Sequence, residues 1–384
     1  MRFDFATAAR ILFGEGRCLE VSSLASEMGR RALVVTGSAP SRAEPLIESL
    51  SRAGLGPVVF CTSGEPTTGT AADGVRLARE AGCDVVVGFG GGSALDAAKA
   101  VAALLANGGE VEDYLEVIGH GRPLRLPSVP LVAVPTTAGT GAEVTSNAVL
   151  RSDRHRVKVS LRSPLMLARA AVVDPLLTRS MPPEVTAATG GDALTQLVEA
   201  FVSNAANPMT DGICREGMAR ASRSLRRAFE DGSDGAARED MSLASLFGGL
   251  ALSNARLGAA HGFAGPIGGS FRAPHGAVCA RLLPFVMEGN LAALRRRDPG
   301  SPSLRRYEAA ARILTGRPDA RPEDGVDWIH ALCVSLKLPT LRTYGIGGED
   351  VPSIVAKTTR SSSTKGNPVA LTEEELTTML TGAL

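Results

Sequence analysis

Four short runs rich in β-branched residues alternate with longer segments of helical character in the first third of the chain. The runs cover residues 32–36, 57–61, 84–88 and 131–135, and segments 41–53 and 68–81 between them predict crossover helices. This alternation predicts a parallel sheet with helices on both faces. Since ligands of such sheets bind beyond the carboxyl ends of the strands, we expect function in the turns that follow them.

The composition changes beyond about Pro175, where segments rich in Ala, Leu, Arg and Glu have helical spacing and strand patterns nearly disappear. Residues 175–184 hold three prolines and mark the natural boundary. A length of 384 residues is enough for two domains, each with its own core. We therefore predict an α/β domain over residues 1–178 and an all-helical domain over residues 179–384.

Charge and cysteine content exclude several classes of function. Lys and Arg total 41 against 40 for Asp and Glu, so no overall field attracts nucleic acid or an anionic membrane. The six cysteines show no paired spacing, which favours a reducing compartment. The N-terminus lacks the apolar core of a signal peptide, and no later segment approaches the length of a membrane span without charge. A soluble, cytoplasmic protein is expected.

The third predicted strand runs into a glycine-rich turn, Gly90-Gly-Gly-Ser-Ala-Leu-Asp-Ala-Ala-Lys. Backbone N–H groups at the start of a helix, unshielded by side chains, can bind a pyrophosphate. The spacing is that of neither the dinucleotide fingerprint nor the P-loop, so a tight turn that simply needs glycine is an equal alternative. Asp96 and Lys99 lie three residues apart, where they could pair, hold the turn or reach a ligand.

The fourth predicted strand leads into a stretch dense in hydroxyls and glycines, Pro135-Thr-Thr-Ala-Gly-Thr-Gly-Ala-Glu-Val-Thr-Ser. Its hydroxyls could hydrogen-bond a ribose or a carboxamide. A hairpin turn would explain the glycines, but not the four threonines and one serine between Thr136 and Ser146.

Two of the five histidines, His261 and His275, flank a segment rich in glycine and proline. A turn there would bring both toward one point, and Asp192 is the candidate third ligand of a divalent metal. Asp192 follows two glycines and precedes good helix formers, which predicts that it lies in the first turn of a helix, with Gln196 on the same face. The alternative is that both histidines are packing or hydrogen-bonding residues.

In combination, these motifs resemble the iron-containing, or group III, alcohol dehydrogenases. The resemblance extends from Phe3-Asp-Phe and Phe13-Gly-Glu-Gly to Asn367-Pro and residues 371–376, so it covers essentially the whole chain. It implies a Rossmann-like dinucleotide-binding domain, a helical metal-binding domain and a nicotinamide between them, in a dehydroquinate synthase-like architecture. It also implies a homodimer or larger homo-oligomer.

The resemblance carries over to the site residue by residue. It implies that Asp96 and Lys99 support the pyrophosphate turn and that the metal ligands include Asp192. The pyrophosphate is implied to contact Gly90, Gly91, Gly92 and Ser93. The rest of the cofactor is implied to contact Thr136, Thr137 and Thr140, and the metal is implied to bind Asp192, His261 and His275.

Two positions depart from the family pattern. Many members carry a histidine ligand where this chain has Gln196, so either Gln196 completes the site or the metal has three protein ligands, as in the related zinc-dependent glycerol dehydrogenases. The metal could therefore be Fe²⁺ or Zn²⁺. A histidine implicated in proton transfer is Gly265 here, so the proton must pass through water, a cofactor ribose hydroxyl or another side chain.

Two further positions bear on specificity. Gly37 occupies the place where NAD-using relatives carry aspartate, and Ser38 and Arg42 follow it, which favours NADP over NAD. Alternatively, Arg42 is only solvated and both cofactors bind. Arg256 stands where relatives usually have a small residue and could anchor an anionic substrate group, although a solvated or structurally paired arginine is the favoured interpretation.

The function predicted from all of this is reversible hydride transfer between a nicotinamide and a small alcohol or aldehyde bound to a divalent metal. Two alternatives remain. One is a metal-independent reductase similar to the maleylacetate reductases, and the other is a catalytically silent relative that binds nucleotide. A lyase resembling dehydroquinate synthase would need extra basic phosphate-binding residues, which are not evident.

Overall fold

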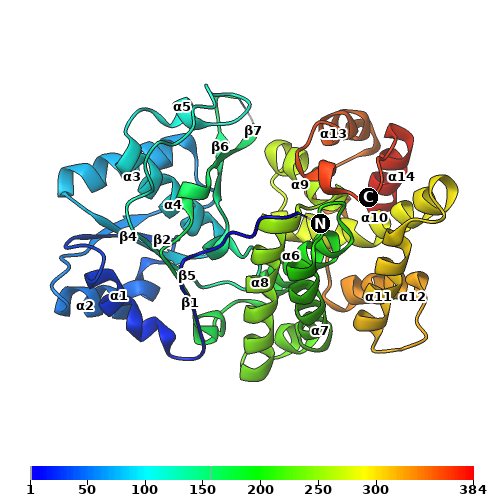
Figure 1. Cartoon of the computed structure of the whole chain (residues 1–384), viewed down its shortest axis with the longest axis horizontal. Helices are drawn as coiled ribbons and strands as arrows, with labels where there is room; N and C mark the ends of the chain where they lie inside the picture. The colour runs from blue at the N-terminus through cyan, green and yellow to red at the C-terminus, as the bar shows by residue number, and fades with distance from the viewer. Residues whose placement is uncertain (1, 156) are drawn as a thin grey trace. The chain divides into compact units, whose positions relative to one another are not determined.

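The computed structural model describes residues 2–155 and 157–384, and it divides them into two compact units (Figure 1). The α/β unit comprises Ala6–Thr137 and Gly141–Thr178. The helical unit comprises Arg179–Leu384, together with residues 2–5 and Ala138–Thr140.

The α/β unit is built on a six-stranded parallel sheet, which confirms the predicted fold class. In spatial order its strands are β1 (Ile11–Phe13), β8 (Ala170–Val173), β5 (Leu131–Pro135), β4 (Val85–Gly90), β2 (Ala32–Thr36) and β3 (Val58–Cys61). Every residue of β2, β4, β5 and β8 is buried, as expected for central strands covered on both faces. Gly90 pairs with Pro135 at the carboxyl ends of β4 and β5, so the turns after these two strands begin side by side.

Helices and short 3₁₀ turns connect these strands. α3 shows why the sequence predicts it well, because Thr67 caps its first turn by accepting a 3.0 Å hydrogen bond from the backbone N–H of Thr70, and Gly82 ends it with φ 68°. The helices are α1 (Val21–Ser26), α2 (Glu44–Arg52), α3 (Thr68–Ala81), α4 (Gly92–Asn107) and α5 (Val111–Tyr114); the 3₁₀ turns are η1 (Arg17–Glu20), η2 (Pro40–Ala43), η3 (Ala142–Val144), η4 (Pro164–Met166) and η5 (Pro175–Thr178).

A β-hairpin, β6 (Asn147–Ser152) with β7 (Val157–Arg162), adds a two-stranded antiparallel sheet. Lys99 of α4 holds this hairpin, since its ammonium donates to the Thr145 hydroxyl at 2.8 Å and to the Asn147 carbonyl. Asp96 pairs with Lys99 at 2.8 Å and accepts from the backbone N–H of Val149 at 3.1 Å. The two residues therefore join the helix that follows the glycine-rich turn to the hairpin.

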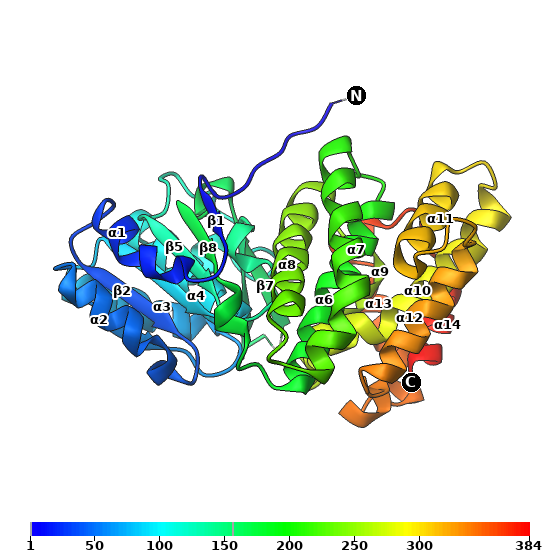
Figure 2. The same ribbon diagram turned by 90° about the horizontal axis from the view of Figure 1, so that it is seen from below.

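The helical unit contains no strand among its described residues. Its helices α6, α7 and α8 run side by side (Figure 2). The elements are α6 (Pro183–Val202), α7 (Pro208–Glu230), α8 (Gly235–Ala255), α9 (Ala259–Ser270), α10 (His275–Arg297), α11 (Pro302–Thr315), α12 (Pro322–Ser335), η6 (Leu341–Tyr344), η7 (Gly348–Asp350), α13 (Val351–Thr358), η8 (Ser363–Gly366) and α14 (Glu373–Ala383).

Helix α10 belongs to both hydrophobic cores of this unit. Leu283 and Met287 pack with α6, α7, α8, α11 and α12, whereas Val278 and Leu282 pack with α9, α13 and α14. α10 is long and apolar enough to cross a membrane by length and composition alone, but 72% of its apolar window is buried inside the protein. Its apolar character is therefore explained by its place between two cores.

Two local predictions were wrong. α6 begins at Pro183, so Asp192 lies in the middle of a helix rather than in its first turn. The segment between His261 and His275 is mostly the helix α9, which continues through Gly265 and Pro266. It is helical because its apolar residues, among them Ala260, Phe263, Ala264 and Ile267, fall at helical spacing and are buried.

Glu143 in η3 gives the α/β unit a pH-dependent stability. Its side chain is buried and Oε1 has no hydrogen-bond partner. Burial raises the pKa of Glu143 to about 7, although a backbone hydrogen bond and the charge of Lys99 lower it. Because this pKa lies above that of the unfolded chain, the contribution to stability is fully present below about pH 4.5 and is lost as the pH rises through 7.

We expect Glu143→Gln to remove this loss. From pH 5 to pH 8, the free energy of unfolding of the variant should gain about 2 kcal/mol relative to the unchanged protein. Urea unfolding at both pH values measures the difference. The same substitution at the exposed Glu48 is the control and should give no such gain. Parallel pH dependence of Glu143→Gln and the unchanged protein would contradict the prediction.

Candidate metal centre and nucleotide turn

The start of α10 lies directly against the middle of α6. A Cβ atom added to Gly276 would lie 2.3 Å from the Ala188 carbonyl oxygen and 2.9 Å from the Cβ of Asp192. On α6, a Cβ added to Gly191 would lie 2.5 Å from the Cβ of Ala280. Only glycine at these two positions allows the helices to come so close, and the contact places His275 beside Asp192.

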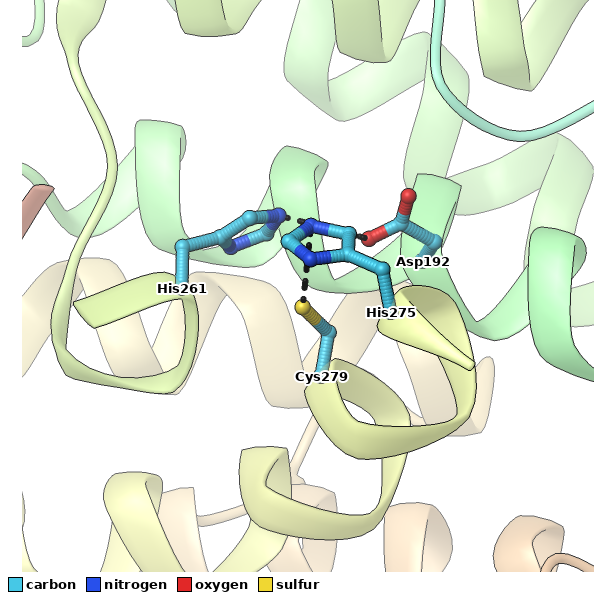
Figure 3. A group of neighbouring side chains, drawn as sticks. All are labelled: Asp192, His261, His275 and Cys279. Atoms are coloured by element: carbon cyan, nitrogen blue, oxygen red, sulfur yellow. Dashed lines mark hydrogen bonds and ion pairs between the residues drawn. The ribbon is translucent and has the colours of Figure 1, made fainter. Parts of the chain in front are cut away.

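Four side chains from three helices converge at this contact (Figure 3). Asp192 comes from α6, His261 from the first turn of α9, His275 from the first residue of α10 and Cys279 from the next turn of α10. Oδ1 of Asp192 lies 3.3 Å from Nε2 of His261 and 4.0 Å from Nε2 of His275. The potential ligand atoms of all four residues lie within 4.8 Å of one another.

The structure therefore brings together the three residues that the sequence singles out, Asp192, His261 and His275, and adds Cys279. Sequence reasoning missed Cys279 because it treats the six cysteines as scattered. The available signal was the spacing His275-x-x-x-Cys279, which places both side chains on one face of a helix.

Polar atoms in this cluster are buried without hydrogen-bond partners. The side chains of Asp192 and His261 are only 3% and 6% exposed, yet Oδ1 of Asp192 and Nε2 of His261 form no hydrogen bond. Buried polar atoms rarely go unpaired, because their desolvation is costly. A carboxylate oxygen and two imidazole nitrogens suit a divalent cation, so the donor set fits a metal. His275 is 41% exposed and leaves the cluster open on one side.

Glu199 fixes the orientation of His261. One oxygen of Glu199 accepts from Nδ1 of His261 at 2.7 Å, and the other accepts from the backbone N–H of Ala260 at 2.7 Å. With Nδ1 donating, Nε2 of His261 carries the lone pair that a metal needs. Sequence reasoning missed Glu199, although it lies two helical turns after Asp192 on the same face of α6.

Gln196 also contacts Asp192. Its amide nitrogen donates to Oδ2 of Asp192 at 3.3 Å, and its oxygen has no hydrogen-bond partner. In this arrangement Gln196 orients the carboxylate and leaves Oδ1 directed at the histidines. That Gln196 itself binds the metal stays a prediction.

The electrostatics of the cluster favour positive charge. Burial disfavours the charged form of Asp192, but the neighbouring His261 and His275 hold its pKa below the usual value. For His261, burial is outweighed by Cys279, Asp192 and Glu199, which raise its pKa well above 6.5. Cys279 and Asp192 likewise raise the pKa of His275. The carboxylates of Asp192 and Glu199 would stabilise a bound cation in the same way.

A buried amide pair anchors the first turn of α9, which carries His261. Asn367 donates to Oδ1 of Asn290 at 2.7 Å, and Asn290 donates back to Oδ1 of Asn367 at 3.1 Å. Oδ1 of Asn367 also accepts from the backbone N–H of Ala259 at 3.3 Å. The segment near the end of the chain thus helps to position a candidate ligand.

The glycine-rich turn joins β4 to the long helix α4. Gly91 is the N-cap residue of α4 and has no side-chain cap, so N–H groups at the start of the helix remain free to bind an anion. A Cβ at Gly91 would lie 3.2 Å from the Thr137 hydroxyl, and the Thr136 N–H donates to the Gly90 carbonyl at 2.9 Å. The turn therefore packs closely against the hydroxyl-rich segment after β5.

The predicted cofactor residues occupy several environments. Gly92 and Ser93 begin α4, whereas Asp96 and Lys99 bind each other and the hairpin. Thr140 belongs to the helical unit. The nucleotide contacts implied for all of these residues stay predictions.

The segment after β2 is open at the positions that bear on cofactor choice. A Cβ at Gly37 would meet no atom within 4 Å, and Ser38 and Arg42 are exposed. Arg42 lies in η2 and donates to the Leu177 carbonyl at 2.8 Å. The position of Gly37 is thus open to at least one further atom, and the guanidinium of the nearby Arg42 is partly engaged by this hydrogen bond.

Arg256 ends α8 in a strained backbone conformation. It is exposed, with φ 62° and ψ 177°, a region that is essentially restricted to glycine. Gly265, one turn after His261, would meet no atom within 4 Å if it carried a Cβ. The proton-transfer position therefore holds no side chain.

Comparison with known proteins agrees with this fold. A family model described as "Iron-containing alcohol dehydrogenase" matches residues 8–175, and one described as "Fe-containing alcohol dehydrogenase family, C-terminal" matches residues 186–384. Alcohol dehydrogenase 4 of Saccharomyces cerevisiae is 32% identical over 374 residues, with 96% of this chain and 95% of that protein covered.

Two further similarities concern a nicotinamide-linked enzyme and a crystal structure. The NAD-dependent methanol dehydrogenase of Bacillus methanolicus is 30% identical, with 97% of each chain covered. A crystal structure of 1,3-propanediol oxidoreductase superposes with a TM-score of 0.93 at 31% identity, and 100% of both chains is covered.

We expect Gly276→Ala to weaken metal binding, because the new methyl group must push α10 away from the Ala188 carbonyl and move His275. Affinity should fall roughly tenfold or more, measured by metal analysis after competition with a chelator. Gly212→Ala in α7 is the matched control, since a Cβ there meets no atom within 4 Å. Equal affinity in both variants would show that the close contact does not set the site.

Arg256→Gly should stabilise the protein by about 1 kcal/mol, because glycine relieves the backbone strain at a small cost in unfolded-state entropy. Denaturant unfolding measures this change. Arg256→Ala, which removes the guanidinium but keeps the strain, should give no gain. If alanine stabilises as much as glycine, the effect comes from the side chain and not from the backbone.

Proposed function

Because the chain belongs to the iron-containing alcohol dehydrogenase family, we propose that it is a metal-dependent, NAD(P)-linked alcohol dehydrogenase or aldehyde reductase acting on a small alcohol or aldehyde. The observation that carries the proposal is the convergence of Asp192, His261 and His275, in which Oδ1 of Asp192 and Nε2 of His261 are buried without a hydrogen-bond partner among the described residues. Such a centre has no evident purpose in a protein that only binds nucleotide.

These three residues would hold the metal, which when bound supplies a Lewis acid for the alcohol or carbonyl oxygen. The chain's own contribution is to prepare the donors. Glu199 keeps the proton of His261 on Nδ1, and Gln196 binds the outer oxygen of Asp192. The burial of Asp192 and His261 excludes water from one side of the metal cluster, while the exposed edge of His275 leaves the other side open.

The nicotinamide cofactor performs the hydride chemistry, and the protein orients it. The N–H groups at the start of α4 would bind its pyrophosphate, with Thr136 and Thr137 beside them. We propose that NADP is preferred over NAD, because Gly37 offers no carboxylate to a ribose hydroxyl and leaves room for a phosphate near Ser38 and Arg42. The methanol dehydrogenase of Bacillus methanolicus is named as NAD-dependent, so in its cofactor preference this chain would differ from that relative.

Gly265 removes one route for the proton. With no side chain one turn after His261, proton exchange with the alcohol oxygen must use water, a ribose hydroxyl or another side chain. A homodimeric state and a cytoplasmic location stay predictions.

The alternative is a metal-independent reductase similar to the maleylacetate reductases. It is supported by Gln196 and Gly265, the two positions that depart from the family pattern. Against it stand the unpartnered buried atoms of Asp192 and His261, which a metal-free site would leave uncompensated. Metal analysis of the untreated protein separates the two.

Oxidation of NADPH and of NADH, each with a panel of small aldehydes, tests the proposal. We expect turnover with NADPH to exceed that with NADH, to fall on chelation and to return when Zn²⁺ or Fe²⁺ is added. His261→Ala should lose turnover, since it removes a ligand. Full activity in protein shown to be free of metal would remove the Lewis-acid role, and equal use of both cofactors would remove the NADP preference.

A further inference from the structure

Cys279 points into the metal cluster from the same helix face as His275 (Figure 3). Its side chain is fully buried, and its sulfur lies 3.6 Å from Nε2 of His275. His275 and Cys279 are four residues apart in α10, so both project from one face within one turn. By contrast, the thiol of Cys333 donates a hydrogen bond to the Ala280 carbonyl at 3.4 Å.

Two of the separations match those of neighbouring atoms around one tetrahedral metal. With metal–sulfur bonds of about 2.3 Å and metal–nitrogen or metal–oxygen bonds of about 2.1 Å, tetrahedral neighbours lie roughly 3.4 to 3.6 Å apart. The sulfur of Cys279 lies 3.6 Å from the His275 nitrogen, and the His261 nitrogen lies 3.3 Å from the Asp192 oxygen. The His275 nitrogen lies 4.0 Å from the Asp192 oxygen, slightly farther, and all four ligand atoms lie within 4.8 Å of one another.

A second observation, independent of the cysteine, marks the same point as a ligand site. Oδ1 of Asp192 and Nε2 of His261 are buried, lack hydrogen-bond partners and face the cluster that Cys279 completes. Gln196, which occupies the place of a histidine ligand in many family members, directs its amide nitrogen at Asp192 instead. α6 of this chain thus provides one strong metal donor fewer than the same helix in those family members, while α10 provides a thiol.

We propose that Cys279 is the fourth protein ligand and that Asp192, His261, His275 and Cys279 together hold Zn²⁺ in preference to Fe²⁺. Thiolate is a soft donor that suits zinc, whereas a glutamine oxygen is a weak one. On binding, the thiol loses its proton to solvent, and the thiolate and carboxylate together balance the two charges of the cation. This inference rests on the proposed metal-dependent function and specifies the metal.

Cobalt substitution tests the ligand directly. Metal is first removed from the protein with a chelator. The protein is then loaded with Co²⁺, and its absorption spectrum is recorded. We expect an intense near-ultraviolet band from thiolate-to-cobalt charge transfer in addition to the weaker visible bands of tetrahedral cobalt. Cys279→Ser should lose the near-ultraviolet band and keep visible bands, while Cys61→Ser, which removes an exposed thiol of the α/β unit, should keep both. A spectrum without the charge-transfer band, or the same band in Cys279→Ser, would overturn the proposal.

X-ray absorption at the zinc edge of the unchanged protein gives a readout that does not depend on how a variant folds. The Zn²⁺-loaded protein should show one zinc–sulfur distance of about 2.3 Å beside the shorter zinc–nitrogen and zinc–oxygen distances. A spectrum that needs no sulfur neighbour would refute the role of Cys279 as a ligand. Competition between Zn²⁺ and Fe²⁺ should favour Zn²⁺ in the unchanged protein and favour it less in Cys279→Asn; an unchanged ratio would refute the metal preference.

The two proposals fail differently. If the protein binds no metal and still turns over aldehyde, the proposed function is wrong and this inference falls with it. If it requires metal for turnover but shows neither the charge-transfer band nor a zinc–sulfur distance, only the assignment of Cys279 is wrong.

Discussion

The contact of α10 with α6 at Gly276 is the constraint on which the candidate centre depends. Its ligands come from three helices, and their mutual distances are fixed by how closely the helix backbones approach. At 2.3 Å from the Ala188 carbonyl, the place of a Cβ is already taken, so the sequence has one choice at Gly276. Since metal ligands must be held within a few tenths of an ångström, a backbone contact of this kind defines the site better than flexible loops would.

The apolar packing of α10 reinforces that constraint. Because one side of α10 packs in the core with α6 to α8 and the other in the core with α9, α13 and α14, a shift of the helix would open voids in both. Glu199 and the Asn290–Asn367 pair then fix His261 from a second direction. The polar network is held by hydrogen bonds on its outer side, and Oδ1 of Asp192 and Nε2 of His261 are left unpaired where the candidate ligand atoms meet.

Much of the fold was predictable, because a central parallel strand must be apolar on both faces, and β2, β4 and β5 are continuous runs of such residues. The edge strand β1 has only three residues and one buried side chain, so it leaves little pattern, and the hairpin β6–β7 depends on Lys99, which is distant in sequence. Gly190 and Gly191 suggest a helix start, yet they serve close packing within α6. The convergence of Asp192, His261 and His275 was predictable from residue type, whereas Cys279 and Glu199 become visible only when helical register and contacts are known.

All four residues of the metal cluster lie in the helical unit, whereas the glycine-rich turn lies in the α/β unit. A cation bound there would therefore add its binding free energy to the unfolding of the helical unit, about 2.7 kcal/mol at a free concentration one hundred times the dissociation constant. Nucleotide pyrophosphate bound at the turn would act on the α/β unit in the same way. With both ligands bound as proposed, resistance to unfolding would depend on two separate ligand supplies, and scarcity of the metal would weaken the helical unit.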